Sequence, residues 1–72
     1  MIIHPASIIE EGAKLGERVS IGPYAVIERE TEIGDGSEIR AHAVIKRYTT
    51  LGPSNTVHEG AVIGGEPQDL SF

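Results

Sequence analysis

The stretch Ile21–Ile45, IGPYAVIERETEIGDGSEIRAHAVI, has an isoleucine at every sixth position and decides the fold. The same spacing extends in both directions until it covers eleven aliphatic sites: Ile3, Ile9, Leu15, Ile21, Ile27, Ile33, Ile39, Ile45, Leu51, Val57 and Ile63. A period of six matches neither an amphipathic helix nor a coiled coil, whereas a short fixed repeat is typical of a β-solenoid. We therefore predict an all-β fold, a hexapeptide-repeat parallel β-helix over residues 1–63.

A second column of small or short polar residues lies two positions before these aliphatics: Ser7, Ala13, Val19, Ala25, Thr31, Ser37, Ala43, Thr49, Asn55 and Ala61. The small residue, its successor and the aliphatic would form a strand with side chains pointing in, out and in. The other three residues must turn a corner, and glycine and proline gather there, as in Gly22-Pro23 and Gly34-Asp35-Gly36. Three strands would close a triangular coil of about eighteen residues, which predicts about four coils.

Composition limits the function. The chain has 72 residues, a net charge of −5 and six lysines and arginines, which argues against nucleic-acid binding. There is no cysteine, and no apolar run approaches the length of a membrane span. The aliphatic column alone buries too little to hold so short a chain folded. We expect a cytoplasmic protein without a cofactor that is part of something larger, an oligomer, or both.

Outward positions distinguish the three faces. One face is apolar on its outside, because its outward residues are Ile8, Val26, Val44 and Val62. The other two are mostly polar, with outward residues Ile2, Ser20, Glu38 and Thr56, and Lys14, Glu32, Thr50 and Gln68. An exposed aliphatic stripe is typical of an interface, although strand propensity is an alternative explanation. We predict self-association through the apolar face with three-fold symmetry.

The histidines are predicted to share one corner. His4, His42 and His58 fall between the first face and the apolar face, beside Tyr24. Tyr24, His42 and His58 could line a cleft in which an imidazole acts as a general base or binds a polar ligand. The alternative is that they are solvated turn residues. We predict no metal site, because the histidine spacings fit no compact zinc motif.

Charged residues gather on another corner, where a solvated edge with mutual ion pairs is expected: Glu10, Glu11, Glu28, Arg29, Glu30, Lys46 and Arg47. Arg40, Lys46 and Arg47 could form a docking patch for an acidic carrier protein. The repeat breaks at Asp69, where an aliphatic residue is due. Residues 64–72 therefore predict a loop that leaves the prism, either a functional loop or a fraying terminus.

Several segments carry a family resemblance: His4-Pro5, Ile21-Gly22-Pro23-Tyr24, Ala41-His42-Ala43-Val44 and, above all, Pro67-Gln68-Asp69-Leu70. Together they resemble the N-terminal coils of the UDP-N-acetylglucosamine 3-O-acyltransferases of lipid A biosynthesis. The hexads are shared by many acyl- and acetyltransferases, and the loop motif is far more specific. The resemblance covers the whole chain, which corresponds to about the first quarter of such an enzyme.

This resemblance implies a left-handed β-helix, assembled as a cytoplasmic homotrimer with active sites between subunits. Members transfer an (R)-3-hydroxyacyl group from acyl carrier protein to the sugar 3-hydroxyl of a UDP-sugar. Gln68 and Asp69 match loop residues that help to hold the acylated sugar nucleotide, and the catalytic histidine is expected beyond Phe72. The family commonly has Leu-Lys-Tyr where this chain has Leu70-Ser71-Phe72, so one charged contact is in doubt.

Two other classes of function stay open. One is a different hexapeptide enzyme, such as a related acyltransferase or a γ-type carbonic anhydrase, for which bound zinc would be diagnostic. The other is a non-catalytic β-helical scaffold or self-assembling module, because an open last coil leaves unpaired strand edges. We expect no catalytic residue within these 72 residues and no activity from the chain alone.

Overall fold

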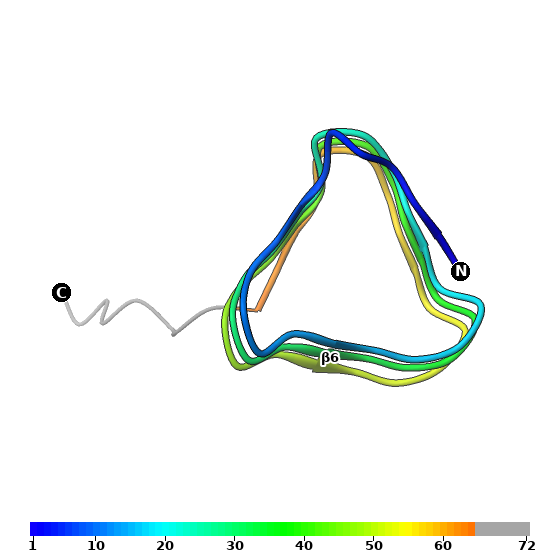
Figure 1. The fold of residues 1–72 in the computed structure, drawn as a ribbon, viewed down its shortest axis with the longest axis vertical. Helices are drawn as coiled ribbons and strands as arrows, with labels where there is room; N and C mark the ends of the chain where they lie inside the picture. The colour runs from blue at the N-terminus through cyan, green and yellow to red at the C-terminus, as the bar shows by residue number, and fades with distance from the viewer. Residues whose placement is uncertain (65–72) are drawn as a thin grey trace, which may run out of the picture.

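The computed structural model describes residues 1–64, which form a triangular prism of short strands (Figure 1). No helix is found in this part of the chain. Each strand has two residues and ends on the aliphatic of its hexad: β1 (Ile2–Ile3), β2 (Ile8–Ile9), β3 (Lys14–Leu15), β4 (Ser20–Ile21), β5 (Val26–Ile27), β6 (Glu32–Ile33), β7 (Glu38–Ile39), β8 (Val44–Ile45), β9 (Thr50–Leu51), β10 (Thr56–Val57) and β11 (Val62–Ile63). The predicted hexapeptide-repeat β-helix is confirmed.

The strands stack into three parallel sheets, one on each side of the prism. Their orders are β1-β4-β7-β10, β2-β5-β8-β11 and β3-β6-β9. The register joins residues one coil apart, as in Ile3↔Ile21 and Ile27↔Ile45. The described residues therefore hold three full coils and two strands of a fourth, in agreement with the predicted eighteen-residue coil.

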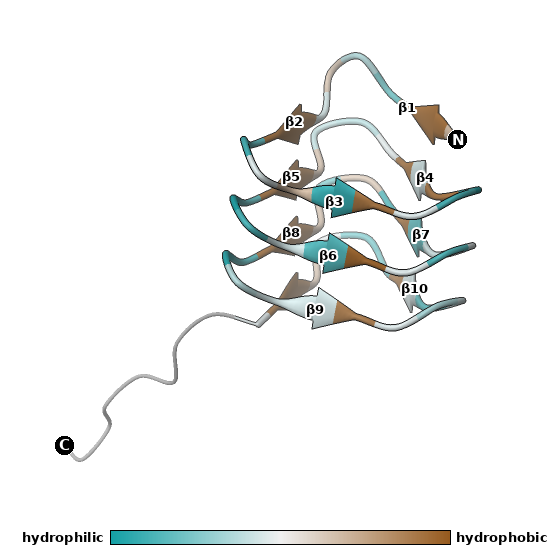
Figure 2. Cartoon of the chain, turned by 60° about the horizontal axis from the view of Figure 1, so that its bottom comes forward, coloured by the Kyte–Doolittle hydropathy of each residue, from teal (hydrophilic) through white to brown (hydrophobic). Residues whose placement is uncertain are grey.

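The prism is left-handed. In Figure 1 the first coil lies nearest to the viewer, and the chain runs counter-clockwise as it recedes. In Figure 2, turned so that the bottom of that view comes forward, the first strand of each sheet (β1, β2 and β3) is the uppermost of its stack, and β9 and β10 lie near the lower end. This hand is opposite to that of ordinary parallel crossovers.

The aliphatic column forms the core in the middle coils. Ile21, Ile27, Ile39 and Ile45 are at most 1% exposed, whereas Ile3 in the first coil is 42% exposed because no coil covers it. Side chains of the second column fill the space between the aliphatics, and two of them are buried hydroxyls, Thr31 and Ser37. The small column therefore lets backbones of successive coils approach closely without leaving voids.

From the second corner of the chain onward, each corner contains one residue in the left-handed backbone region. This conformation recurs every sixth residue, at Gly12, Arg18, Tyr24, Glu30, Gly36, His42, Tyr48, Ser54 and Gly60, with φ between 57° and 84°. Only three of these nine are glycines, although glycine is the residue that adopts such φ values without steric cost. The sequence thus predicts where the corners lie but not which residue bends the backbone.

In several hexads a glycine directly follows the aliphatic residue, as Gly34 follows Ile33. Gly34 lies where the next coil passes close by, because a Cβ added there would be 2.5 Å from the Gly52 carbonyl carbon and the Pro53 nitrogen. The predicted loop over residues 64–72 lies outside the described residues except for Gly64, and so do Gln68 and Asp69.

Candidate functional site

The turns between the β1 sheet and the β2 sheet stack on one edge of the prism and carry all three histidines. The eighteen-residue register places His4, Arg40 and His58 in one column of this corner and Tyr24 and His42 in the neighbouring column. We call these five residues the histidine corner. The structure thus brings the predicted cleft residues Tyr24, His42 and His58 to one edge, and it adds Arg40 to them.

Tyr24 and His42 form an aromatic pair on successive coils. Their ring centroids are 5.1 Å apart and their planes are inclined by 20°, which is a stacked arrangement. Both residues have left-handed backbones, with φ of 61° and 63°, so their side chains leave the corner in the same direction. Tyr24 as a whole remains 61% exposed, so one side of the pair is accessible to solvent.

His58 contacts a guanidinium group. Its Nδ1 lies 3.5 Å from Arg40 Nη1, and because arginine can only donate, Nδ1 is the acceptor in this long contact. Arg40 also binds Glu38 Oε2 at 3.3 Å and Glu59 Oε1 at 3.7 Å. Arg40 is thereby part of the histidine corner, whereas Lys46 and Arg47 lie at the next corner, and the suggested docking patch of these three residues stays a prediction.

His4 has a local role. Its Nδ1 accepts a hydrogen bond of 3.0 Å from the Ala6 N–H, while the Ser7 hydroxyl donates to the His4 carbonyl at 2.7 Å. These bonds hold the first corner of the chain. Within residues 1–64 no three histidine, aspartate or glutamate side chains converge as a metal site would require. The corner can bind a ligand through ring faces and hydrogen bonds, but it contains no nucleophile paired with a base.

The apolar face is a continuous ladder. Its outward side chains pair in register, Ile8 with Val26, Val26 with Val44, and Val44 with Val62. Ile8 and Val62 at the two ends are 56% and 63% exposed. Figure 2 shows β2, β5 and β8 in the colours of apolar residues, in contrast to β3 and β6.

The charged corner is held together by carboxylates that reach the backbone of the next coil. Glu28 Oε1 accepts from the Arg47 N–H at 3.0 Å, and its Oε2 binds Lys46 Nζ at 3.2 Å. These two interactions, the backbone hydrogen bond first, lower the pKa of Glu28. Glu10 Oε1 accepts from the Arg29 N–H at 3.0 Å in the same way, one coil earlier.

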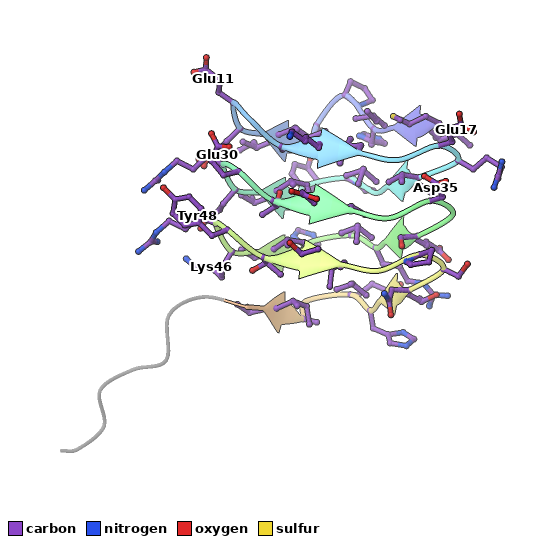
Figure 3. All side chains as sticks on the ribbon, turned by 90° about the horizontal axis from the view of Figure 1, so that it is seen from below. Glu11, Glu17, Glu30, Asp35, Lys46 and Tyr48 are labelled. Atoms are coloured by element: carbon purple, nitrogen blue, oxygen red, sulfur yellow. The ribbon has the colours of Figure 1, made fainter. Side chains whose placement is uncertain are left out.

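The charged corner also carries exposed charged side chains and a tyrosine. Figure 3 shows Glu11, Glu30, Lys46 and Tyr48 gathered on one side of the prism and Glu17 and Asp35 on the other. The Arg29 guanidinium lies 5.7 Å from the centroid of the Tyr48 ring, a cation–π contact. The third face carries a shallow depression lined by Lys14, Glu32 and Thr50 among others, which the sequence did not suggest.

Comparison with known proteins finds a matching family model and a similar solved structure. Residues 12–47, half of the chain, match the family model for the bacterial transferase hexapeptide of six repeats. The solved structure of a UDP-N-acetylglucosamine acyltransferase from Campylobacter jejuni superposes with a TM-score of 0.89 and 41% sequence identity over 97% of this chain.

The chain spans 28% of the length of that acyltransferase. Among curated proteins no match was found. None of the helices that a membrane span would need occurs in residues 1–64. The six-residue period, the triangular coil and the match of the family model agree with one another. This chain therefore belongs to the bacterial transferase hexapeptide family.

Proposed function

We propose that these residues are the N-terminal coils of an acyltransferase that moves an (R)-3-hydroxyacyl group from acyl carrier protein to the 3-hydroxyl of UDP-N-acetylglucosamine. The observation that carries the proposal is the 41% identity to a UDP-N-acetylglucosamine acyltransferase over 97% of this chain. The Pro67-Gln68-Asp69-Leu70 motif supports it independently of the repeats. This reaction would be the first step of lipid A biosynthesis, and it would take place in the cytoplasm.

The chemistry requires groups that the described coils do not bring together. A neutral histidine must take the proton of the sugar hydroxyl while its oxygen attacks the thioester carbonyl, and a donor must stabilise the oxyanion. The C–O bond forms, the C–S bond breaks and the proton passes to the carrier thiol. Here His4 and His58 already accept hydrogen bonds at Nδ1, and His42 stacks on Tyr24. We therefore assign the catalytic base, as the family resemblance implies, to the remainder of the proposed acyltransferase rather than to these three histidines.

In this arrangement the 72 residues supply the first coils, the subunit contact and the loop. The apolar face of Ile8, Val26, Val44 and Val62 would join three subunits, which explains why a ladder of aliphatics points outward on only one side. Gln68 and Asp69 would reach the UDP-sugar bound between neighbouring subunits. Their amide and carboxylate can bind the hydroxyl and amide groups of a sugar nucleotide.

A chimera tests the proposal. Residues 1–72 replace the matching coils of the Campylobacter acyltransferase, and transfer of a 3-hydroxyacyl group from acyl carrier protein to UDP-N-acetylglucosamine is followed by mass spectrometry. We expect the chimera to be active and the 72-residue chain alone to be inactive. A folded chimera without transferase activity would contradict the proposal, as would stoichiometric zinc and carbonic anhydrase activity.

A further inference from the structure

The stacked Tyr24 and His42 rings lie directly beside the apolar face. The left-handed corner residues precede the outward strand residues by two positions, so Tyr24 precedes Val26 and His42 precedes Val44. These two rings and two valines belong to the middle coils of the prism. The apolar ladder is therefore widened at mid-height by a pair of aromatic rings.

The ring pair is already ordered within one chain. Stacking at 5.1 Å and the fixed backbones of both residues restrict the rings before any partner arrives. Tyrosine that is held in this way loses little conformational entropy on binding, which is one reason why it is frequent among residues that dominate interface energies. With 61% of Tyr24 exposed, a large surface is still available for burial.

A second tyrosine has the same backbone but a different setting. Tyr48 also lies at a left-handed corner position, with φ of 63°, and is 66% exposed. It precedes Thr50 on the polar face, and its ring contacts the Arg29 guanidinium. Tyr48 therefore matches Tyr24 in residue type, backbone and exposure, and differs in the face that it borders.

The surface beside Tyr24 suits a second copy of this chain. Its outward residues repeat with the spacing of hydrogen-bonded strands, about 4.8 Å. A partner that interdigitates with such a ladder must carry side chains at the same spacing over the same height, and an identical prism does so. No charged residue points outward from β2, β5, β8 or β11, although the chain has a net charge of −5.

We propose that Tyr24, stacked on His42, is the energetic centre of the contact between copies of this chain along the β2-β5-β8-β11 face. This assignment rests on the self-association included in the proposed function. Arg40, with its partners Glu38 and Glu59, forms the polar rim next to this centre.

Sedimentation equilibrium of the 72-residue chain and two matched variants tests the assignment. Tyr24→Asn and Tyr48→Asn each remove one exposed ring and place asparagine, which tolerates positive φ, at the same backbone conformation. We expect Tyr24→Asn to weaken association about thirtyfold or more and Tyr48→Asn to change it less than about threefold. Tyr24→Phe keeps the ring and should associate like the wild type. Far-UV circular dichroism of all three variants checks the fold.

The outcomes separate this inference from the proposed function. Equal effects of the two asparagine variants, or no effect of Tyr24→Asn on an associating wild type, would overturn the role of Tyr24. A monomeric wild-type chain would overturn the association as well. Loss of the role of Tyr24 alone leaves acyl transfer untouched, because the chimera measures transfer by a different readout. A monomeric wild type would also count against a substrate site between subunits.

Discussion

At the scale of single residues, the stacking of coils leaves different amounts of space around identical residues at equivalent positions. Gly34 and Gly52 occupy the same position of the coil, but Gly34 is covered by the next coil. A Cβ at Gly34 would meet backbone atoms at 2.5 Å, whereas among residues 1–64 the nearest atom to one at Gly52 would be the Asn55 Nδ2, at 3.9 Å. The loss of stability caused by a glycine-to-alanine substitution therefore depends on which coil contains the glycine.

Replacing Gly34 by alanine should destabilise the chain. Because backbone atoms of Gly52 and Pro53 cannot move aside as a flexible side chain could, we expect a loss of about 1 to 3 kcal/mol in the free energy of unfolding. Gly52→Ala is the matched control and should change it by less than about 0.5 kcal/mol. Urea unfolding followed by circular dichroism measures both. Similar losses for the two variants would refute the close-approach argument.

Buried hydroxyls give a second prediction. Ser37 is fully buried; its Oγ donates to the Gly52 carbonyl and accepts from the Asn55 N–H, both at 3.1 Å. Ser37→Ala leaves that N–H without its acceptor and should cost about 1 to 3 kcal/mol. Ser7→Ala, in the same column but partly exposed, should cost less, because water can replace the hydroxyl beside the His4 carbonyl. An inverted order in urea unfolding would contradict this account.

At the scale of elements, carboxylates link the corners of successive coils. Glu28 binds the Arg47 N–H and the Lys46 ammonium, and the Asp35 Oδ1 accepts from the Glu17 N–H at 2.9 Å. Two-residue strands make few ladder hydrogen bonds, so these corner contacts add substantially to the coil-to-coil connection. They join residues 18 or 19 positions apart, which only the coil brings together.

The lowered pKa of Glu28 predicts acid sensitivity. Since the hydrogen bond from the Arg47 N–H, and then Lys46, stabilise the charged form, the stabilisation is present above the pKa of the unfolded state. It is lost as the pH falls through the depressed pKa of the folded state. We expect Glu28→Gln to be less stable than the wild type at neutral pH and to lose less stability on acidification.

Thermal unfolding between pH 7 and pH 3 measures this effect. Glu17→Gln is the control, because the Glu17 carboxylate is exposed and its ion pair with Arg18, at 3.9 Å, is long and weak. Its stability should follow that of the wild type over the whole range. A parallel pH dependence of Glu28→Gln and the wild type would show that the Glu28 carboxylate does not link the two coils.

At the scale of the whole molecule, the three sides of the prism differ in the polarity of their outward residues. The aliphatic stripe and the histidine corner adjoin, and the charged corner lies at the other edge of the stripe. A prism with one uncharged side is suited to cyclic association, in which every copy makes the same pair of contacts with its neighbours. The depression over β3, β6 and β9 faces away from that side.

The loop motif supplies a prediction at this scale, because its site would lie between subunits. In the chimera, Gln68→Ala and Asp69→Ala should each raise KM for the UDP-sugar about tenfold or more, since each removes a hydrogen-bonding group from a bound polar ligand. Ser71→Lys restores the residue common in the acyltransferases and should lower KM. Unchanged KM in both alanine variants would exclude a binding role for this loop.

The period of six determined the strands, the coil and the identity of each face without any tertiary information. Side chains alternate along a strand, and three strands close a coil, so the positions of Ile8, Val26, Val44 and Val62 follow by counting. The family resemblance, carried by short motifs, supplied the left hand and the acyltransferase assignment. Periodicity alone does not give the hand, because a left-handed and a right-handed coil stack the same columns. It does not give the function either, because many enzymes share the hexapeptide repeat.

Contacts between corners were decided only by the tertiary structure. Counting places Tyr24 above His42 but does not show that their rings stack, and it does not reveal that Arg40 meets His58 or that Glu28 reaches the backbone of Arg47. These contacts depend on the left-handed backbone of corner residues and on side-chain rotamers. The repeat constrains inward side chains through packing. Corner side chains are exposed and can adopt several rotamers, so the sequence does not determine which nearby partner each one contacts.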